Sequence, residues 1–521
     1  MKDKSHDYVT LLAVLFAVIL GAVVRFYPVL LSNYPLNDGG LFFQMTQDVL
    51  NQNFSLPVYT SYNGSSIPFG YPPLAFYLMA FMQKVLHFRI IDQLHFLPAL
   101  ISTLCIPAFY FLSRSITSSK EKSVFAVYAY ALIPGSYLWL IMGGGITRSL
   151  GLLFGILSIL CVWEMFNKPR ISNLLLSVLF CSLTILSHLG IAWFVFLTSI
   201  MIIIHFGINK KRSIYALLTI IGIFLFTLPW WMVIIQRHGI SSFFNAIQTS
   251  DAFDFSIMFF NFTGEPFIQI LAVIALFGLF AEIARRKFFL FAWLLLIAIL
   301  SARGSPRLAS LPGSMLFGSG VVWVLVPGLV SYTGRVLSDN RSLAEIMQEG
   351  ITKLALGIIL FFALFSALAV PILGLVEIRS LSPNSLQAME WISQNTSSES
   401  QFIILTGEDW KTDPESEWFP ALTGRISTAT VQGSEWLPDR KYFNLINNYK
   451  ILQSCIQQDY SCVELWAEES KVPYSHIYIS KPIEGEKGNY PSVLFSLEES
   501  DQLQLIFENP SVTVYKVIKN Q

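Results

Sequence analysis

The first candidate for chemistry is Asp38, in the stretch YPLNDGGLFFQMTQDVL that follows the first apolar segment. A carboxylate held in a partly apolar site at a membrane face can be tuned to act as a general base. The stretch also has a structural explanation, because Asn37 to Gly40 would make a good helix cap and turn. The position of Asp38 in the longest predicted external loop favours the catalytic interpretation.

Three glycines precede Arg148 in the sequence GGGITR, and this pattern is typical of anion binding. Gly143, Gly144 and Gly145 lie at the expected start of a helix, where backbone N–H groups are unpaired and the helix dipole favours negative charge. Arginine adds a planar fork that matches phosphate oxygens. We therefore expect these four residues to bind a lipid phosphate. Ordinary contact between Arg148 and membrane headgroups is the alternative.

Two further arginines, Arg303 and Arg307, lie in the segment SARGSPRLAS, which is predicted to begin outside the cytoplasm. They depart from the usual enrichment of basic residues in cytoplasmic loops. We expect both to help bind the same phosphate, with snorkelling to ordinary lipid headgroups as the alternative.

Four more side chains are candidates for contact with a substrate: Tyr71 in PFGYPPLAFYL, His188 in LSHLG, Glu265 before a predicted span, and Trp418 in an acid-rich stretch. A tryptophan beside carboxylates can hold a sugar, because the ring covers the CH face and the carboxylates bind hydroxyls. Structural explanations exist for three of them. His188 could be a turn residue, Glu265 a helix cap, and Trp418 part of a hydrophobic core.

The sequence contains no pattern that indicates a bound metal or cofactor. Histidines and cysteines are not clustered at zinc-binding spacings, and no Walker or GxGxxG motif lies in a predicted cytoplasmic loop. We predict no cofactor, although a divalent metal remains an alternative. Cys455 and Cys462 in CIQQDYSC could form a local disulfide or remain two free thiols.

Membrane helices must position these residues. The chain of 521 residues is 54% hydrophobic and 13% charged, with a mean hydropathy of +0.56, whereas soluble domains carry about 25% charged residues. This composition excludes a soluble enzyme and a free nucleic-acid-binding protein. It predicts a polytopic α-helical membrane protein with about 11 transmembrane helices. The expected spans are 8–30, 93–113, 123–141, 149–166, 172–188, 190–206, 214–232, 267–284, 288–302, 308–330 and 354–376.

Basic residues predict the orientation of these spans. They gather in every second loop, for example in KKR at 210–212 and RRK at 285–287, and short cytoplasmic loops are enriched in Lys and Arg. This pattern holds only if the apolar segment 72–88 does not cross the membrane. We therefore interpret 72–88 as a helix lying against the outer face, within a long first external loop at 31–92. A twelfth span is the alternative.

The chain changes character after residue 376. Residues 377–521 contain 11 basic and 20 acidic residues, and their apolar runs have strand length. We expect strands at QFIILTG, SHIYIS, SVLFSL, LQLIFE and SVTVYKV, and a helix at SPNSLQAMEWISQNT. The prediction is a transmembrane domain at 1–376 and a small extracytoplasmic C-terminal α/β domain at 377–521.

The NDGG stretch, the YPPL element and the layout of the spans resemble the GT-C superfamily of integral-membrane glycosyltransferases. Protein O-mannosyltransferases and lipid A aminoarabinose transferases are the most similar branches. The resemblance implies sugar transfer from a polyprenyl-phosphate donor, with Asp38 as the catalytic base. Two departures stand out. Gly39 follows Asp38 where the mannosyltransferases have an Asp-Glu pair. In the second external loop, GGGITRS replaces the acidic motif of the oligosaccharyltransferases, so the metal site of that branch is not implied.

We therefore predict an inverting, multi-pass glycosyltransferase of the cell membrane that acts on the extracytoplasmic side. Its partners would be a polyprenyl-phosphate sugar donor, a glycan, lipid or protein acceptor, and membrane lipids, but no nucleic acid. Arginine charge would stabilise the leaving phosphate. The alternatives are a non-catalytic assembly or sensor protein, and a lipid or sugar transporter. A transporter is disfavoured because the spans contain few acidic residues.

Overall fold

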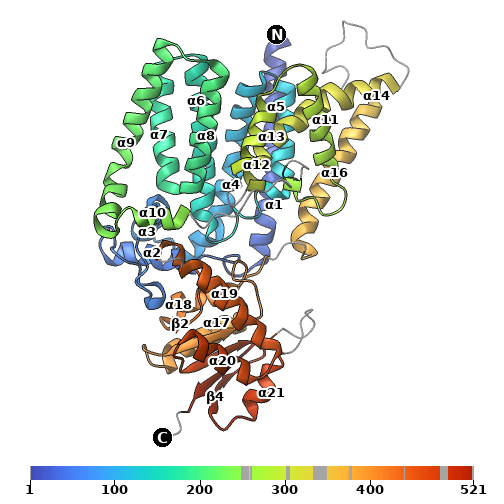
Figure 1. The fold of residues 1–521 in the computed structure, drawn as a ribbon. Coiled ribbons are helices and arrows are strands. Elements are labelled where there is room, and N and C mark those ends of the chain that lie inside the picture. The colour runs from blue at the N-terminus through green and yellow to red at the C-terminus, as the bar shows by residue number, and fades with distance from the viewer. Residues whose placement is uncertain are drawn as a thin grey trace.

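The computed structural model describes residues 2–247, 257, 261–300, 305–332, 349–374, 378–438, 441–481 and 491–518. A bundle of long helices carries a smaller domain at one end, and the N-terminus lies at the other end (Figure 1). The predicted fold class, a helical membrane protein with a small C-terminal α/β domain, is confirmed.

Seven described helical segments are long and apolar enough to cross a membrane. They belong to α1 (Lys2–Leu31), α4 (Ile90–Thr117), α6 (Gly145–Asn167), α8 (Leu189–Phe206), α9 (Lys210–His238), the continuous segment α13 (Ser305–Gly320), η5 (Val321–Leu325) and α14 (Val326–Tyr332), and α16 (Gly350–Ile372). Shorter helices stand beside them: α5 (Lys120–Leu132), α7 (Ile171–Ser187), α11 (Ile270–Ala284) and α12 (Phe289–Leu300) (Figure 1). The predicted number of 11 spans is not confirmed by length and composition alone.

The predicted span 123–141 is wrong in its second half. Helix α5 ends at Leu132 because Pro134 disfavours helical geometry in the preceding residue, and Ile133 is extended. The chain then forms the short 3₁₀-helix η2 (Pro134–Ser136) and turns before α6 begins at Gly145. This irregular segment brings the three glycines close to the end of α1.

The segment 72–88 forms a short helix, α3 (Leu74–Leu86), of 13 residues. Such a helix is about 20 Å long and cannot cross a hydrocarbon core of about 30 Å. Helix α3 lies near α2 (Gly40–Asn51) and α10 (Ser241–Ile247) at the end of the bundle that faces the smaller domain (Figure 1). Its length does not favour a twelfth span, and its place on the outer membrane surface stays a prediction. The short 3₁₀-helices η1 (Tyr62–Gly64) and η4 (Asn261–Thr263) lie in loops.

The C-terminal region contains a five-stranded sheet with the order β2-β1-β3-β5-β4. Strands β2, β1 and β3 are parallel, whereas β5 pairs antiparallel with β3 and β4. The strands are β1 (Gln401–Leu405), β2 (Ile426–Ser427), β3 (His476–Ser480), β4 (Leu503–Glu508) and β5 (Val512–Val517). The helices are α17 (Pro383–Asn395), α18 (Pro414–Thr423), α19 (Lys441–Ser454), α20 (Tyr460–Ser470) and α21 (Val493–Glu498), with the 3₁₀-helices η6 (Ser434–Trp436) and η7 (Cys455–Gln457).

Four of the five expected strands and the expected helix are confirmed, but SVLFSL is not a strand. It forms α21, in which Val493, Leu494 and Leu497 are buried together. These positions share one face of a helix but not of a strand, where side chains alternate between faces. Cys455 and Cys462 form a disulfide, which settles the alternative left open by the sequence.

Candidate active site

Asp38 lies in a tight turn between α1 and α2. Asn37 (φ 49°) and Gly39 (φ 140°) both have positive φ, which reverses the chain on each side of Asp38. The Asp38 carboxylate pairs with Arg148, whose Nη2 lies 2.9 Å from Oδ2. The other carboxylate oxygen, Oδ1, accepts the Gly144 N–H at 2.8 Å. Because Gly144 caps α6, the positive end of that helix also stabilises the negative charge of Asp38.

The three glycines do not form an open phosphate cradle, so the sequence interpretation of their N–H groups needs correction. Gly143 N–H donates to Leu36 O at 2.9 Å, Gly144 N–H to Asp38, and Gly145 N–H to Met142 O at 2.8 Å. The backbone donors expected to be free are thus engaged within the chain. The anion at the start of α6 is Asp38 itself.

The glycines instead allow the backbone before α6 to pack closely against Asp38. A Cβ on Gly143 would lie 2.0 Å from Asp38 O, and one on Gly144 would lie 2.5 Å from Asp38 Oδ2. Any side chain at these positions would push Asp38 away. The missing side chains therefore allow the carboxylate to approach the end of α6.

Two arginines and a histidine lie in this part of the structure, and of these Arg148 contacts Asp38 directly. Arg148 is mostly buried and also donates from Nε to Trp139 O at 3.0 Å. Arg307, near the start of α13, is 5% exposed, and its buried Nε has no hydrogen-bond partner among the described residues. The charges of Arg148 and Arg307 act on one another and on His188. Arg303, the other predicted arginine, lies outside the described residues.

His188 links α7 and α8. Its Nδ1 accepts the Ile191 N–H at 3.2 Å and so caps α8, which is the turn role considered for it. Burial and the charges of Arg307 and Arg148 lower the pKa of His188 to about 3. The imidazole is therefore neutral at pH 7, and it adds no further positive charge to the arginines.

Glu417 is a member of the site that the sequence analysis missed. It lies in the first turn of α18, in the C-terminal region, and is buried. Its Oε1 accepts the Gly39 N–H at 2.9 Å, directly beside Asp38 in the chain. Burial, and secondly the charge of Asp38, raise the pKa of Glu417 to about 8. The sequence offers no local signal for this contact, because 378 positions separate the two residues.

Two of the substrate candidates are used to join the C-terminal region to the first external loop. Trp418 is fully buried, packs edge-on against Tyr34 with ring centroids 4.9 Å apart, and covers Gly39. It thus has the packing role that was the alternative to sugar binding. The Tyr71 hydroxyl donates to Glu435. The centroids of the Tyr71 and Trp436 rings lie 5.1 Å apart.

Glu265 also has the structural role considered for it. Its two carboxylate oxygens accept the N–H groups of Leu271 and Ala272 at 3.1 and 3.2 Å, at the start of α11. Burial raises its pKa to about 6. The structure therefore employs Glu265 as a helix cap. In the described part of the chain, no group of three or more His, Cys, Asp or Glu side chains is arranged to hold a metal ion.

Comparison by sequence with known proteins finds one family model over part of the chain. A family model described as "6-pyruvoyl-tetrahydropterin synthase related domain; membrane protein" matches residues 70–319, slightly less than half of the chain. No curated protein matches the sequence.

Solved structures are more informative. ArnT from Cupriavidus metallidurans, bound to undecaprenyl phosphate, is 14% identical with a TM-score of 0.57, over 97% of this chain and 98% of that one. The archaeal oligosaccharyltransferase AglB from Archaeoglobus fulgidus, with an inhibitory peptide and a dolichol-phosphate, is 14% identical with a TM-score of 0.56, over 91% and 70%. The mycobacterial arabinofuranosyltransferase AftD is 13% identical with a TM-score of 0.59, over 97% and 40%. The predicted GT-C fold is confirmed.

Proposed function

We propose that this chain, which has the GT-C fold, is a membrane glycosyltransferase that moves a sugar from a lipid-phosphate donor to an acceptor hydroxyl. The observation that carries the proposal is the pairing of Asp38 with Arg148 beside the buried Arg307. A carboxylate and two guanidiniums supply the two charges that such a reaction needs, one to accept a proton and one to stabilise a leaving phosphate.

Asp38 is the proposed general base. Its carboxylate takes the proton from the acceptor hydroxyl, while that oxygen forms a bond to the anomeric carbon of the sugar. The bond between the anomeric carbon and the phosphate oxygen breaks on the opposite face, and its electron pair leaves with the lipid phosphate. Configuration at the anomeric carbon is therefore inverted.

Arg307 and Arg148 are the proposed phosphate ligands. The buried Nε of Arg307 lacks a partner among the described residues, and an unpaired buried donor is costly unless a ligand satisfies it. In this structure Arg148 donates a hydrogen bond to the Asp38 carboxylate. When a phosphate arrives, it competes with Asp38 for this guanidinium, and the carboxylate is released to act as a base. Arg303 stays a predicted third ligand of the phosphate.

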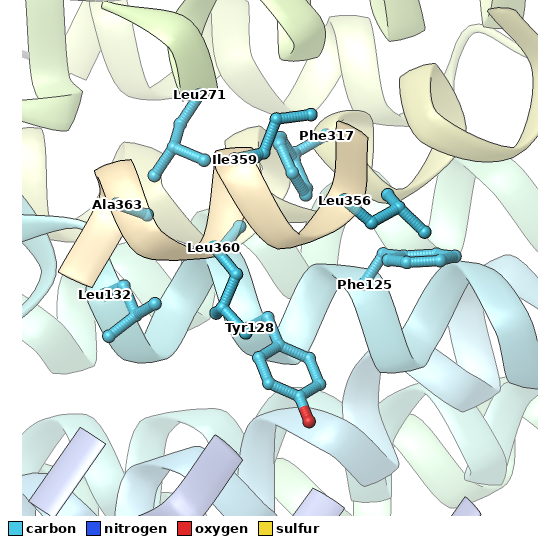
Figure 2. A pocket seen from close by; sticks show the side chains of 10 residues that line it. Phe125, Tyr128, Leu132, Leu271, Phe317, Leu356, Ile359, Leu360 and Ala363 are labelled. Atoms are coloured by element: carbon cyan, nitrogen blue, oxygen red, sulfur yellow. The ribbon is translucent and has the colours of Figure 1, made fainter. Parts of the chain in front are cut away.

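The apolar pocket in Figure 2 is the proposed site for part of the lipid chain. It lies between α5, α11, α13 and α16, and α13 also carries Arg307 near its start. Its lining is apolar apart from the Tyr128 hydroxyl: Phe125, Tyr128, Ala129, Leu132, Leu271, Phe317, Leu356, Ile359, Leu360 and Ala363. A chain anchored by its phosphate at Arg307 could follow α13 into this pocket.

The reaction is proposed to take place outside the cytoplasm. The C-terminal region and Asp38 lie at the end of the bundle away from the N-terminus (Figure 1), and the basic loops predict that the N-terminal end is cytoplasmic. The acceptor is a glycan, lipid or protein. We propose that the arginines provide the positive charge in place of a metal ion.

The test uses the full chain purified in nanodiscs. Polyprenyl phosphates carrying mannose, glucose or arabinose are mixed with membranes that supply acceptors, and release of undecaprenyl phosphate is measured. We expect turnover with at least one donor, insensitive to EDTA, and none with Asp38→Asn. A wild-type chain that releases no lipid phosphate from any of these donors would refute the proposal.

A further inference from the structure

The turn that carries Asp38 is hydrogen-bonded to residues of the C-terminal region. Asn37 N–H donates to Arg379 O at 2.7 Å, and Arg379 N–H donates to Asn37 Oδ1 at 2.6 Å. Gly39 N–H donates to Glu417 Oε1 at 2.9 Å. Asn37 and Gly39, the two neighbours of Asp38 in the chain, are thus both hydrogen-bonded to residues beyond 376.

Gly40 shows how closely the two parts approach. A Cβ on Gly40 would lie 2.6 Å from Glu417 O, so only glycine leaves room for the backbone of α18. Tyr62 strengthens the contact, because its hydroxyl donates to Glu417 O at 2.6 Å. Trp418 covers Gly39 from the same helix. The first external loop and α18 therefore form one packed unit around the turn.

Helix α2 needs a partner of this kind. Its N-cap is Gly39, which has no side chain that could accept the N–H groups of the first turn. The Glu417 carboxyl accepts the N–H of Gly39 and that of Leu41 instead. Glu417 is only 4% exposed, so water cannot readily replace it.

We propose that Glu417 is a positioning residue for Asp38, contributed by the C-terminal domain. By accepting the N–H groups of Gly39 and Leu41, it fixes the turn that directs Asp38 toward Arg148 and the acceptor. The catalytic site is then complete only when α18 is docked on the first external loop. The inference rests on the proposed role of Asp38 as the base.

The charge of Glu417 gives the proposal a pH signature. The groups that face its carboxyl are Asp38, Arg148 and the N–H groups of Gly39 and Leu41. With its pKa raised to about 8, Glu417 is mostly neutral at pH 7 and ionises above pH 8. Its ionised form would add a second negative charge that repels a lipid phosphate. The KM for the donor should therefore rise between pH 7 and pH 9.

Hydrogen exchange and kinetics together test the proposal on the full chain in nanodiscs. In Glu417→Ala, the amides of Gly39 and Leu41 should exchange at least tenfold faster. The kcat should fall at least tenfold, whereas the Kd for undecaprenyl phosphate should change less than twofold. Glu417→Gln retains one carbonyl acceptor, so it should recover part of kcat, and it should abolish the rise of KM between pH 7 and pH 9.

Glu415→Gln is the matched control. Glu415 lies in the same helix but faces the interior of the domain, where it accepts from Ser385 and Tyr478. The control should change neither exchange at Gly39 nor kcat. If Glu417→Ala does not fold, the exchange and pH profile of Glu417→Gln replace it.

The outcomes separate the two proposals. Wild-type transfer with unchanged exchange and kcat in the Glu417 variants would overturn the positioning role alone. A wild-type chain without transfer activity would refute the proposed function, and the positioning role would fall with it, even if the exchange at Gly39 responded as expected.

Discussion

At the scale of the residue, Asp38 and a donor phosphate compete for the same cation. Arg148 now neutralises Asp38 at 2.9 Å. Removing the charge of Asp38 should therefore release Arg148 for the phosphate. A charge-assisted hydrogen bond is worth about 1.5–3 kcal/mol, so the competition is large enough to measure.

The first prediction concerns Asp38→Asn. The amide cannot accept the proton of an acceptor hydroxyl, so transfer should be lost, while undecaprenyl phosphate should bind at least as tightly as to wild type. Turnover and the Kd for undecaprenyl phosphate are measured on the same preparation. Loss of donor binding in this variant would mean that Asp38 holds the site together rather than acting as a base.

The second prediction concerns Gly144. A methyl group there would lie 2.5 Å from Asp38 Oδ2, so Gly144→Ala should displace the carboxylate without changing any charge. We expect turnover to drop by about tenfold or more, corresponding to about 1.4 kcal/mol. Gly328→Ala is the control, because a Cβ at Gly328 meets nothing within 4 Å. Equal turnover in both variants would show that catalysis does not depend on the close approach of Gly144 to the Asp38 carboxylate.

At the scale of the element, α16 closes one side of the apolar pocket beside α5, and Ala363 is its small residue there (Figure 2). Its methyl group leaves space that a larger side chain would fill. The residues that line the pocket are apolar apart from the hydroxyl of Tyr128, which points away from the other labelled side chains in Figure 2, so affinity for a lipid chain would come from buried apolar area.

The third prediction is that Ala363→Trp fills the pocket and weakens binding of undecaprenyl phosphate by about tenfold, or about 1.4 kcal/mol. Phe361→Trp is the control, since Phe361 is exposed on the same helix. Binding of a soluble short-chain phosphate should be unaffected in both. Unchanged affinity in Ala363→Trp would show that the lipid chain lies elsewhere.

At the scale of the whole molecule, the C-terminal region joins the membrane part through two carboxyl groups, those of the buried Glu417 and the half-buried Glu435. Burial raises the pKa of Glu435 to about 7, and Glu435 accepts from Tyr71 across the junction. Burial likewise raises the pKa of Glu415 to about 7, within the domain. A group whose pKa is raised on folding stabilises the fold while it is protonated.

The fourth prediction follows from the sign of these shifts. The stabilisation is full below pH 4.5, the ordinary pKa of the two carboxyls, and is lost as the pH rises through about 7. The Tm of the C-terminal region should therefore fall by a few degrees between pH 6 and pH 8.5. Thermal unfolding in nanodiscs measures it.

The neutral variant Glu435→Gln checks the cause of this pH dependence. It should make the dependence of Tm on pH weaker, because the amide at 435 does not ionise in this range while Glu415 still does. A Tm that falls equally in wild type and in Glu435→Gln would assign the pH dependence to other groups.

The amino-acid sequence is enough to predict the fold class, because the signals for it are local. The length of apolar runs sets the membrane helices, and β-rich runs such as QFIILTG set the strands. Asp38 and Arg148 could be selected for the same reason, since each lies at the edge of an apolar run. The strand expected at SVLFSL failed because a short apolar run fits both periods until its packing partners are known.

The contacts that these residues make depend on how the chain packs, and the sequence does not show them. Packing joined Asp38 to Arg148, engaged the glycine N–H groups that the sequence left open, and brought Glu417 to Gly39 from a distant part of the chain. The physical reason is that a hydrogen bond depends on two partners. A sequence shows the chemical type of each partner, whereas the fold determines whether they lie within 3 Å of one another.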